Sequence, residues 1–143
     1  MLFLPPECES TIRSEGQKAY PNECCGVMLG LIEDSGAKKV KKTQAIGNAQ
    51  TDSEQYHRFL ITPEDMLNAE QTARKMGLDV VGFYHSHPDC PAAPSDYDRD
   101  HALPFYSYVI VSVEKSEAKD LTSWELAADR TAFLPEKFSK EEQ

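Results

Sequence analysis

Apolar residues gather in short runs along the chain, and these runs alternate with amphipathic segments. Three mostly apolar runs have the length of buried strands, about four to eight residues. They occupy Cys25–Ile32, Asp79–Ser86 and Ser107–Val113. Weaker patterns predict further strands at Lys38–Ile46, Tyr56–Ile61, Asp120–Ala127 and Thr131–Leu134. The strands recur through the whole chain, so a sheet forms the centre of the predicted fold.

Helical patterns separate these runs. Thr62 followed by Pro63 is a strong helix start, because threonine caps the first turn and proline suits its first position. The apolar stripe that follows comprises Met66, Leu67, Ala69, Ala73 and Met76, and Gly77 ends it. Further helices are predicted at Pro6–Tyr20 and Ser95–Leu103. The interleaving predicts one α/β domain over residues 1–143, a mixed sheet flanked by helices, with a frayed charged tail at 137–143.

Composition narrows the possible partners. The net charge is −9, which disfavours nucleic acid and anionic membrane surfaces as partners. No apolar run approaches the about 18 residues of a membrane-spanning helix, and the start of the chain lacks the basic region of a signal peptide. We therefore expect a cytoplasmic protein whose four cysteines are free thiols.

The strand that ends near residue 87 carries the candidate chemistry. His85 and His87 are two residues apart, so on a strand their side chains project from one face. Pro88 is expected to end regular pairing, because it has no N–H. Asp98 follows a proline-rich segment. Two imidazoles and one carboxylate would give a zinc ion three protein ligands and leave one position open, as in catalytic zinc sites.

Each candidate residue also has a simpler interpretation. The histidines could be hydrogen-bonded core residues, and Ser95-x-x-Asp98 is close to a helix capping box. Ser86 should face away from the histidines. Cys24, Cys25 and Cys90 leave open a thiol nucleophile, a redox-sensitive thiol or a fourth zinc ligand. The paired histidines upstream favour Asp98 as a ligand.

The combined spacing resembles that of the JAMM (MPN-plus) zinc metallopeptidases, and the compact prokaryotic branch especially. The resemblance rests on Tyr84-His85-Ser86-His87-Pro88-Asp89 and Pro94-Ser95-Asp96-Tyr97-Asp98, with an upstream glutamate, and extends from about Pro21 to Val113. It implies an MPN-like (cytidine-deaminase-like) sandwich with zinc on His85, His87 and Asp98. It further implies Glu23 as general base and Ser95 as a donor to the oxyanion. Without the family, Glu23 would be taken as a surface acid.

By the same resemblance, the chain is expected to hydrolyse a peptide or isopeptide bond. The implied substrate is the Gly-Gly tail of a ubiquitin-like or sulfur-carrier protein of the ThiS or MoaD type. A non-catalytic MPN scaffold and a zinc hydrolase of small amides are the alternatives. The scaffold is disfavoured because all five motif positions are present. A homodimer is compatible with the sequence.

Overall fold

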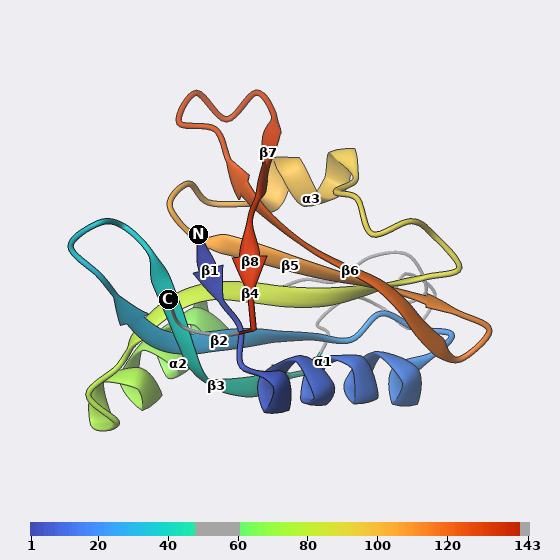
Figure 1. The fold of residues 1–143 in the computed structure, drawn as a ribbon, viewed down its shortest axis with the longest axis horizontal. Coiled ribbons are helices and arrows are strands. Elements are labelled where there is room, and N and C mark those ends of the chain that lie inside the picture. The colour runs from blue at the N-terminus through green and yellow to red at the C-terminus, as the bar shows by residue number, and fades with distance from the viewer. Residues whose placement is uncertain (48–60, 141–143) are drawn as a thin grey trace.

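The structure, a computed structural model, describes residues 1–47 and 61–140. Within these residues the strands form one mixed sheet in the order β7-β6-β5-β4-β2-β3-β1-β8 (Figure 1). The strands are β1 Leu2–Phe3, β2 Cys25–Ile32, β3 Lys38–Ile46, β4 Asp79–Pro88, β5 Ser107–Glu114, β6 Glu117–Leu126, β7 Phe133–Glu136 and β8 Phe138–Ser139. The helices are α1 Pro6–Ala19, α2 Pro63–Lys75 and α3 Asp96–His101. The predicted mixed sheet flanked by helices is confirmed.

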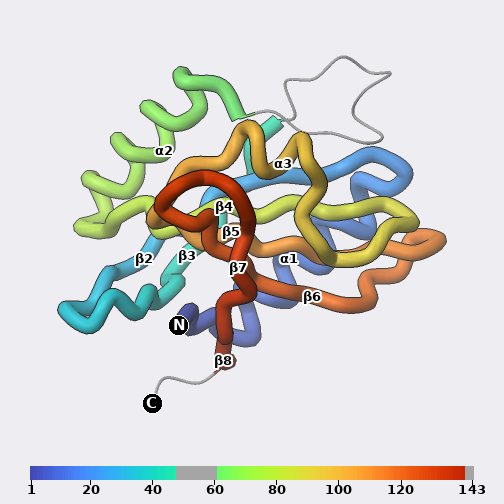
Figure 2. The backbone as a smooth tube through the Cα atoms, turned by 90° about the horizontal axis from the view of Figure 1, so that it is seen from above, coloured from blue at the N-terminus to red at the C-terminus, as the bar shows by residue number. Residues whose placement is uncertain are grey.

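Helices α1 and α2 cover opposite faces of the sheet (Figure 2). One core cluster joins Ile12 of α1 to Met28, Tyr84 and Val111 of the sheet. The other joins Ala69 and Ala73 of α2 to the opposite face, with members including Val27, Leu29, Phe83 and Tyr108. Gly16 lets α1 approach closely, because a Cβ there would lie 3.0 Å from Val113 Cγ2. Burying both faces is what fixes the positions of the central strands.

Strand β4 lies between β2, which it pairs with antiparallel, and β5, which it pairs with parallel. It runs further than predicted, because Pro88 still pairs with Val113. In a parallel ladder the N–H groups of successive residues point alternately to the two sides. Asp89 donates its N–H to Val113 at 2.7 Å, so the missing N–H of Pro88 falls on the other side, beyond the end of β2. The prediction that Pro88 ends pairing is therefore wrong.

Two very short strands were not predicted. Leu2 and Phe3 form β1, which pairs parallel with both β3 and β8 (Figure 1). The predicted frayed tail is wrong for Phe138 and Ser139, because they form β8 against β1. Burial explains the order at the start of the chain, since Leu2 and Leu4 are fully buried. Residues 141–143 lie outside the described residues.

The second helix follows its predicted pattern at the start and departs from it at the end. Thr62 forms a complete capping box with Asp65. Ala69 and Ala73 are buried, whereas Leu67 and Met76 are exposed by 53% and 43%. Met76 is the C-cap, so it has left the helical stripe. Of the predicted strand Tyr56–Ile61, residues 56–60 lie outside the described residues, and Ile61 is not in a strand.

Candidate metal centre

Strand β4 holds His85 and His87 with their side chains together on one face of the sheet. Their Nε2 atoms lie 3.1 Å apart, and the two residues are exposed by only 1% and 8%. Ser86 points to the other face, where its Oγ accepts the backbone N–H of Cys24 at 2.8 Å. The predicted strand geometry, with two imidazoles on one face and a packing serine between them, is confirmed.

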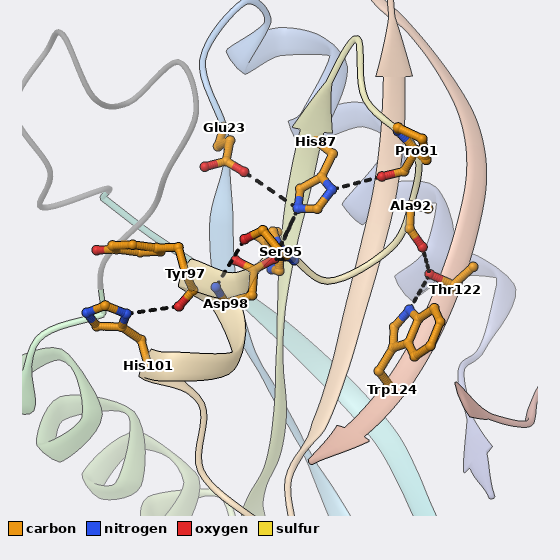
Figure 3. Close-up of polar contacts among 11 residues, drawn as sticks. Glu23, His87, Pro91, Ala92, Ser95, Tyr97, Asp98, His101, Thr122 and Trp124 are labelled. Carbon is orange, nitrogen blue, oxygen red and sulfur yellow. Dashed lines mark hydrogen bonds and ion pairs between the residues drawn. The ribbon is translucent and has the colours of Figure 1, made fainter. Parts of the chain in front are cut away.

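Helix α3 brings Asp98 against the two imidazoles, and Figure 3 shows Asp98 beside His87. Asp98 Oδ2 lies 3.2 Å from the Nε2 atoms of both His85 and His87. The same oxygen accepts the Ser95 N–H at 2.9 Å, and Ser95 Oγ accepts the Asp98 N–H at 3.1 Å. Ser95 is therefore the N-cap of α3 in a full capping box. The cap and the contact with the histidines coexist, so the two interpretations of Ser95-x-x-Asp98 are compatible.

Three atoms could donate an electron pair to a metal ion: His85 Nε2, His87 Nε2 and Asp98 Oδ2. They form a nearly regular triangle, the donor triangle, with edges of 3.1, 3.2 and 3.2 Å. Ligand atoms of a tetrahedral zinc ion at about 2.0–2.1 Å lie about 3.3 Å apart, so this triangle has the dimensions of one face of such a tetrahedron. Two imidazole nitrogens and one carboxylate oxygen are also donors that zinc prefers. The residues present therefore fit a zinc ion.

Glu23 reaches the histidines from another strand. It lies just before β2, whose first residue, Cys25, pairs with His85. Its Oε1 lies 3.8 Å from His87 Nε2, and Glu23, His85 and His87 each offer a ligand atom within 4.8 Å of the others. Its Oε2 is buried without a hydrogen-bond partner in the described part of the chain. Burial, and then the nearby Asp98 carboxylate, raises the pKa of Glu23 to about 9.

The surroundings shift the pKa values of His85 and Asp98 in the directions that suit metal binding. Burial lowers the pKa of His85, against the opposing pull of Asp98, so this imidazole is held neutral. Burial alone would raise the pKa of Asp98, but the adjacent His85, the contact with His87 and the Ser95 N–H hold it well below its usual range. Neutral imidazole and ionised carboxylate are the protonation states that bind a metal ion.

The second nitrogen of His87 is also fixed. His87 Nδ1 donates to the carbonyl oxygen of Pro91 at 2.9 Å (Figure 3). This bond sets the tautomer and leaves Nε2 as the acceptor that faces Asp98. Nothing in the sequence pattern predicts Pro91 as a partner, since its role depends on a loop that turns back over β4.

A cavity of about 350 Å³ adjoins Asp98. Its walls are largely apolar and include Ile61, Met66, Phe83, Tyr97, Leu103 and Tyr108. Tyr97 stacks on His101, another wall residue, with ring centroids 4.0 Å apart. The aromatic wall residues were not predicted as site residues, because their pattern is that of ordinary core positions.

The cysteines stand apart from the triangle. Cys8, Cys24, Cys25 and Cys90 are free cysteines. Burial raises the pKa of Cys24 to about 11 and that of Cys25 to about 12. Cys90 is exposed, and the metal-compatible cluster of the described residues includes no cysteine. Among the described residues, the structure therefore gives no support to a cysteine as a zinc ligand, or to Cys24 or Cys25 as an activated thiol.

Comparison with known proteins places the site in a family. Residues 5–127 match the family of prokaryotic homologs of the JAB domain. The chain belongs to this family. The resemblance to the compact prokaryotic JAMM/MPN proteins is thereby confirmed.

Some of the similar proteins are named for an activity. A desampylase from Haloferax volcanii is 36% identical over 116 residues, which cover 78% of this chain and 80% of that protein. A probable TtuB-protein conjugate cleaving protease from Thermus thermophilus is 25% identical over 114 residues, covering 80% of this chain and 72% of that protein. A JAB1/MPN domain protein from Archaeoglobus fulgidus has a TM-score of 0.55 at 15% identity, with 97% of each chain covered. This last likeness confirms the predicted MPN-like fold.

Proposed function

We propose that this JAB-family protein is a zinc-dependent metallopeptidase. Its substrate would be a peptide or isopeptide bond at the Gly-Gly tail of a ubiquitin-like protein or of a ThiS- or MoaD-type sulfur carrier. The observation that carries the proposal is the donor triangle of His85, His87 and Asp98, with Glu23 beside it. Relatives named as a desampylase and a conjugate cleaving protease support this substrate class.

In this proposal His85, His87 and Asp98 hold the zinc ion. Asp98 is preferred over Glu23 as the third ligand, because its Oδ2 lies 3.2 Å from both imidazoles, whereas the Glu23 Oε1 is 3.8 Å from His87. When bound, zinc supplies Lewis acidity, which polarises a carbonyl and acidifies water near neutral pH. No described cysteine belongs to the cluster, which is consistent with an open fourth position.

Glu23 is the proposed proton carrier. In its ionised form Glu23 has an oxygen, Oε2, that is unpartnered among the described residues and can accept a proton from the attacking water. The water oxygen first adds to the carbonyl carbon. Glu23 then gives the proton to the nitrogen as the C–N bond breaks, so that the amine leaves neutral. Burial raises the pKa of Glu23 to about 9 in the metal-free protein, and a bound zinc ion, as a nearby positive charge, would favour the ionised form that the first step needs.

Ser95 is the proposed donor to the oxyanion. Its Oγ accepts the Asp98 N–H, which orients the side chain and leaves the hydroxyl hydrogen able to donate. A neutral donor held in place by a helix cap needs little reorganisation as negative charge develops on the carbonyl oxygen. The cap and the oxyanion role therefore use different parts of the same hydroxyl group.

The apolar cavity beside Asp98 is the proposed site for the tail of the substrate. A Gly-Gly end has no side chains to fill it, so an apolar residue upstream of the two glycines would occupy the space lined by Phe83, Met66 and Tyr108. We take residues 1–143 as one catalytic domain that works in the cytoplasm, where its cysteines stay reduced. The net charge of −9 disfavours nucleic acid as a partner.

The proposal is tested with a Gly-Gly-tailed small protein joined through its tail to a lysine of a second protein. Mass spectrometry should show two products. One ends in a free Gly-Gly carboxylate, and the other carries the unmodified lysine. A chelator should abolish cleavage and added zinc restore it. Glu23→Gln, which preserves the shape of the side chain, should retain zinc and lose turnover by about 10²–10⁴-fold. Full activity of a zinc-free preparation would refute the proposal, as would loss of zinc together with Glu23.

A further inference from the structure

Three successive carbonyl groups after strand β4 each accept a hydrogen bond from a side chain. Ser112 Oγ donates to the carbonyl of Cys90 at 2.6 Å, His87 Nδ1 to that of Pro91 at 2.9 Å, and Thr122 Oγ1 to that of Ala92 at 2.6 Å. The donors come from three neighbouring strands, β5, β4 and β6. The loop is thus tied to the sheet on both sides of the carbonyl that holds His87.

Thr122 is itself oriented by a second residue. Trp124 Nε1 donates to Thr122 Oγ1 at 2.8 Å (Figure 3). The two residues are two apart on β6, so their side chains share one face of the strand. Because the indole N–H can only donate, it occupies an acceptor site of the hydroxyl and turns the hydroxyl hydrogen toward Ala92. The result is a one-way chain of donors from Trp124 through Thr122 to the loop.

This chain ends one residue from the group that sets the His87 imidazole. A rotation of the Pro91–Ala92 peptide would turn or displace the Pro91 carbonyl, and His87 Nδ1 would lose its acceptor. The ring of His87 would then be free to turn, and its Nε2 would no longer be held 3.1 Å from His85 Nε2 and 3.2 Å from Asp98 Oδ2. Partners that orient a metal-binding histidine are commonly worth 10- to 100-fold in metal affinity.

We propose that Thr122 is a positioning residue of the metal centre. It fixes the loop that fixes His87, although it touches none of the three donors in the triangle. The inference rests on the zinc site of the proposed function, but it concerns metal affinity and not turnover. The relevant property of Thr122 is its hydroxyl group, since the methyl group has no part in the donor chain.

The substitution Thr122→Val tests this directly, because valine has nearly the same shape and cannot donate. It leaves the carbonyl of Ala92 and the indole N–H of Trp124 without the partner they have in the native protein. We expect zinc affinity, measured by competition with a chromogenic chelator, to fall by about 10-fold or more. Thr122→Ser keeps the hydroxyl and should bind zinc within about threefold of the native protein on the same scale.

Two further variants separate positioning from a general loss of stability. Thr131→Val removes a threonine hydroxyl bond elsewhere, to Asp129, and should leave zinc affinity unchanged. Trp124→Phe removes only the donor that orients Thr122, and should weaken zinc binding less than Thr122→Val does. It also provides the test if Thr122→Val does not fold. A purely structural role would lower the melting temperature of the metal-free protein while leaving the zinc affinity of the folded protein unchanged.

The outcomes are distinguishable from failure of the proposed function. If the native protein binds no zinc, the proposed function is wrong. If it binds zinc and the folded Thr122→Val or Trp124→Phe proteins bind it equally tightly, the positioning role is wrong. Weak binding by Thr122→Val with rescue by Thr122→Ser would support the inference whether or not the protein substrate has been identified.

Discussion

Asp98 Oδ2 accepts the backbone N–H of Ser95 at 2.9 Å, three residues earlier in the chain. The same oxygen lies 3.2 Å from the Nε2 atoms of His85 and His87. One atom therefore closes the first turn of α3 and forms a corner of the donor triangle. The helix start and the proposed metal centre are coupled through this atom. Substitutions that keep one of its two roles and remove the other can separate their contributions.

Asp98→Asn should separate the cap from the metal. An asparagine carbonyl can still accept the Ser95 N–H. The unfolding free energy of the metal-free variant should therefore lie within about 1 kcal/mol of that of the native protein. The neutral amide is a much poorer zinc ligand, so zinc affinity should fall by more than the about 10- to 100-fold typical of outer partners. Denaturant titration and chelator competition measure the two effects. Unchanged zinc affinity would remove Asp98 from the ligand set.

Ser95→Ala should have the opposite pattern. Loss of the N-cap hydroxyl should cost about 0.5–2 kcal/mol of unfolding free energy. Zinc content should remain near the native value, because Ser95 offers no atom to the triangle. If Ser95 donates to the oxyanion, kcat should fall by about 10²–10³-fold. A variant that is destabilised but fully active would restrict Ser95 to its capping role.

Glu23 should make the metal-free protein sensitive to pH. Its folded pKa of about 9 lies above its ordinary value of 4.5, so the folded state keeps a proton that the unfolded chain releases. Stability is then fully present below about pH 4.5 and falls as pH rises toward 9, by at most about 1.4 kcal/mol per pH unit. Glu23→Gln lacks this titration. Denaturant titrations of both metal-free proteins between pH 5 and 9 should diverge, and parallel curves would contradict the raised pKa.

The thiols should differ sharply in reactivity. Raised pKa values of about 11 for Cys24 and about 12 for Cys25 keep both protonated near pH 8, and thiolate is the reactive form. Burial also raises the pKa of Cys8, whereas Cys90 is exposed. Alkylation of the native protein should therefore modify Cys90 first, with the others reacting after unfolding. Rapid modification of Cys24 with loss of activity would contradict this expectation and support a thiol nucleophile.

Sequence periodicity predicts the strands in the middle of the chain but not the short strands at its two ends. The bounds predicted for β2 and β3 agree with the structure, because strands of eight and nine residues are long enough to show a pattern, even the weak one of the partly exposed β3. The strands β1 and β8 have two residues each, too few to show any period. Leu2 and Leu4 are instead ordered by contacts with distant parts of the chain.

The candidate site divides in the same way. His85 and His87 can be placed on one face from strand geometry alone, and Ser95 and Asp98 from the local capping pattern. Glu23 cannot be placed from residue patterns, since it meets His87 only because β2 and β4 are neighbours in the sheet. Thr122 and Trp124 carry no signal in the sequence, because their role depends on a loop folded over another strand.

The most direct test of the account is X-ray absorption at the zinc edge of the purified, zinc-loaded protein. We predict about one zinc per chain, surrounded only by nitrogen and oxygen at about 2.0–2.1 Å, with a scattering pattern of two imidazoles. A sulfur shell at about 2.3 Å would place a cysteine in the open position and contradict the account. So would a protein that binds no zinc while His85, His87 and Asp98 are intact.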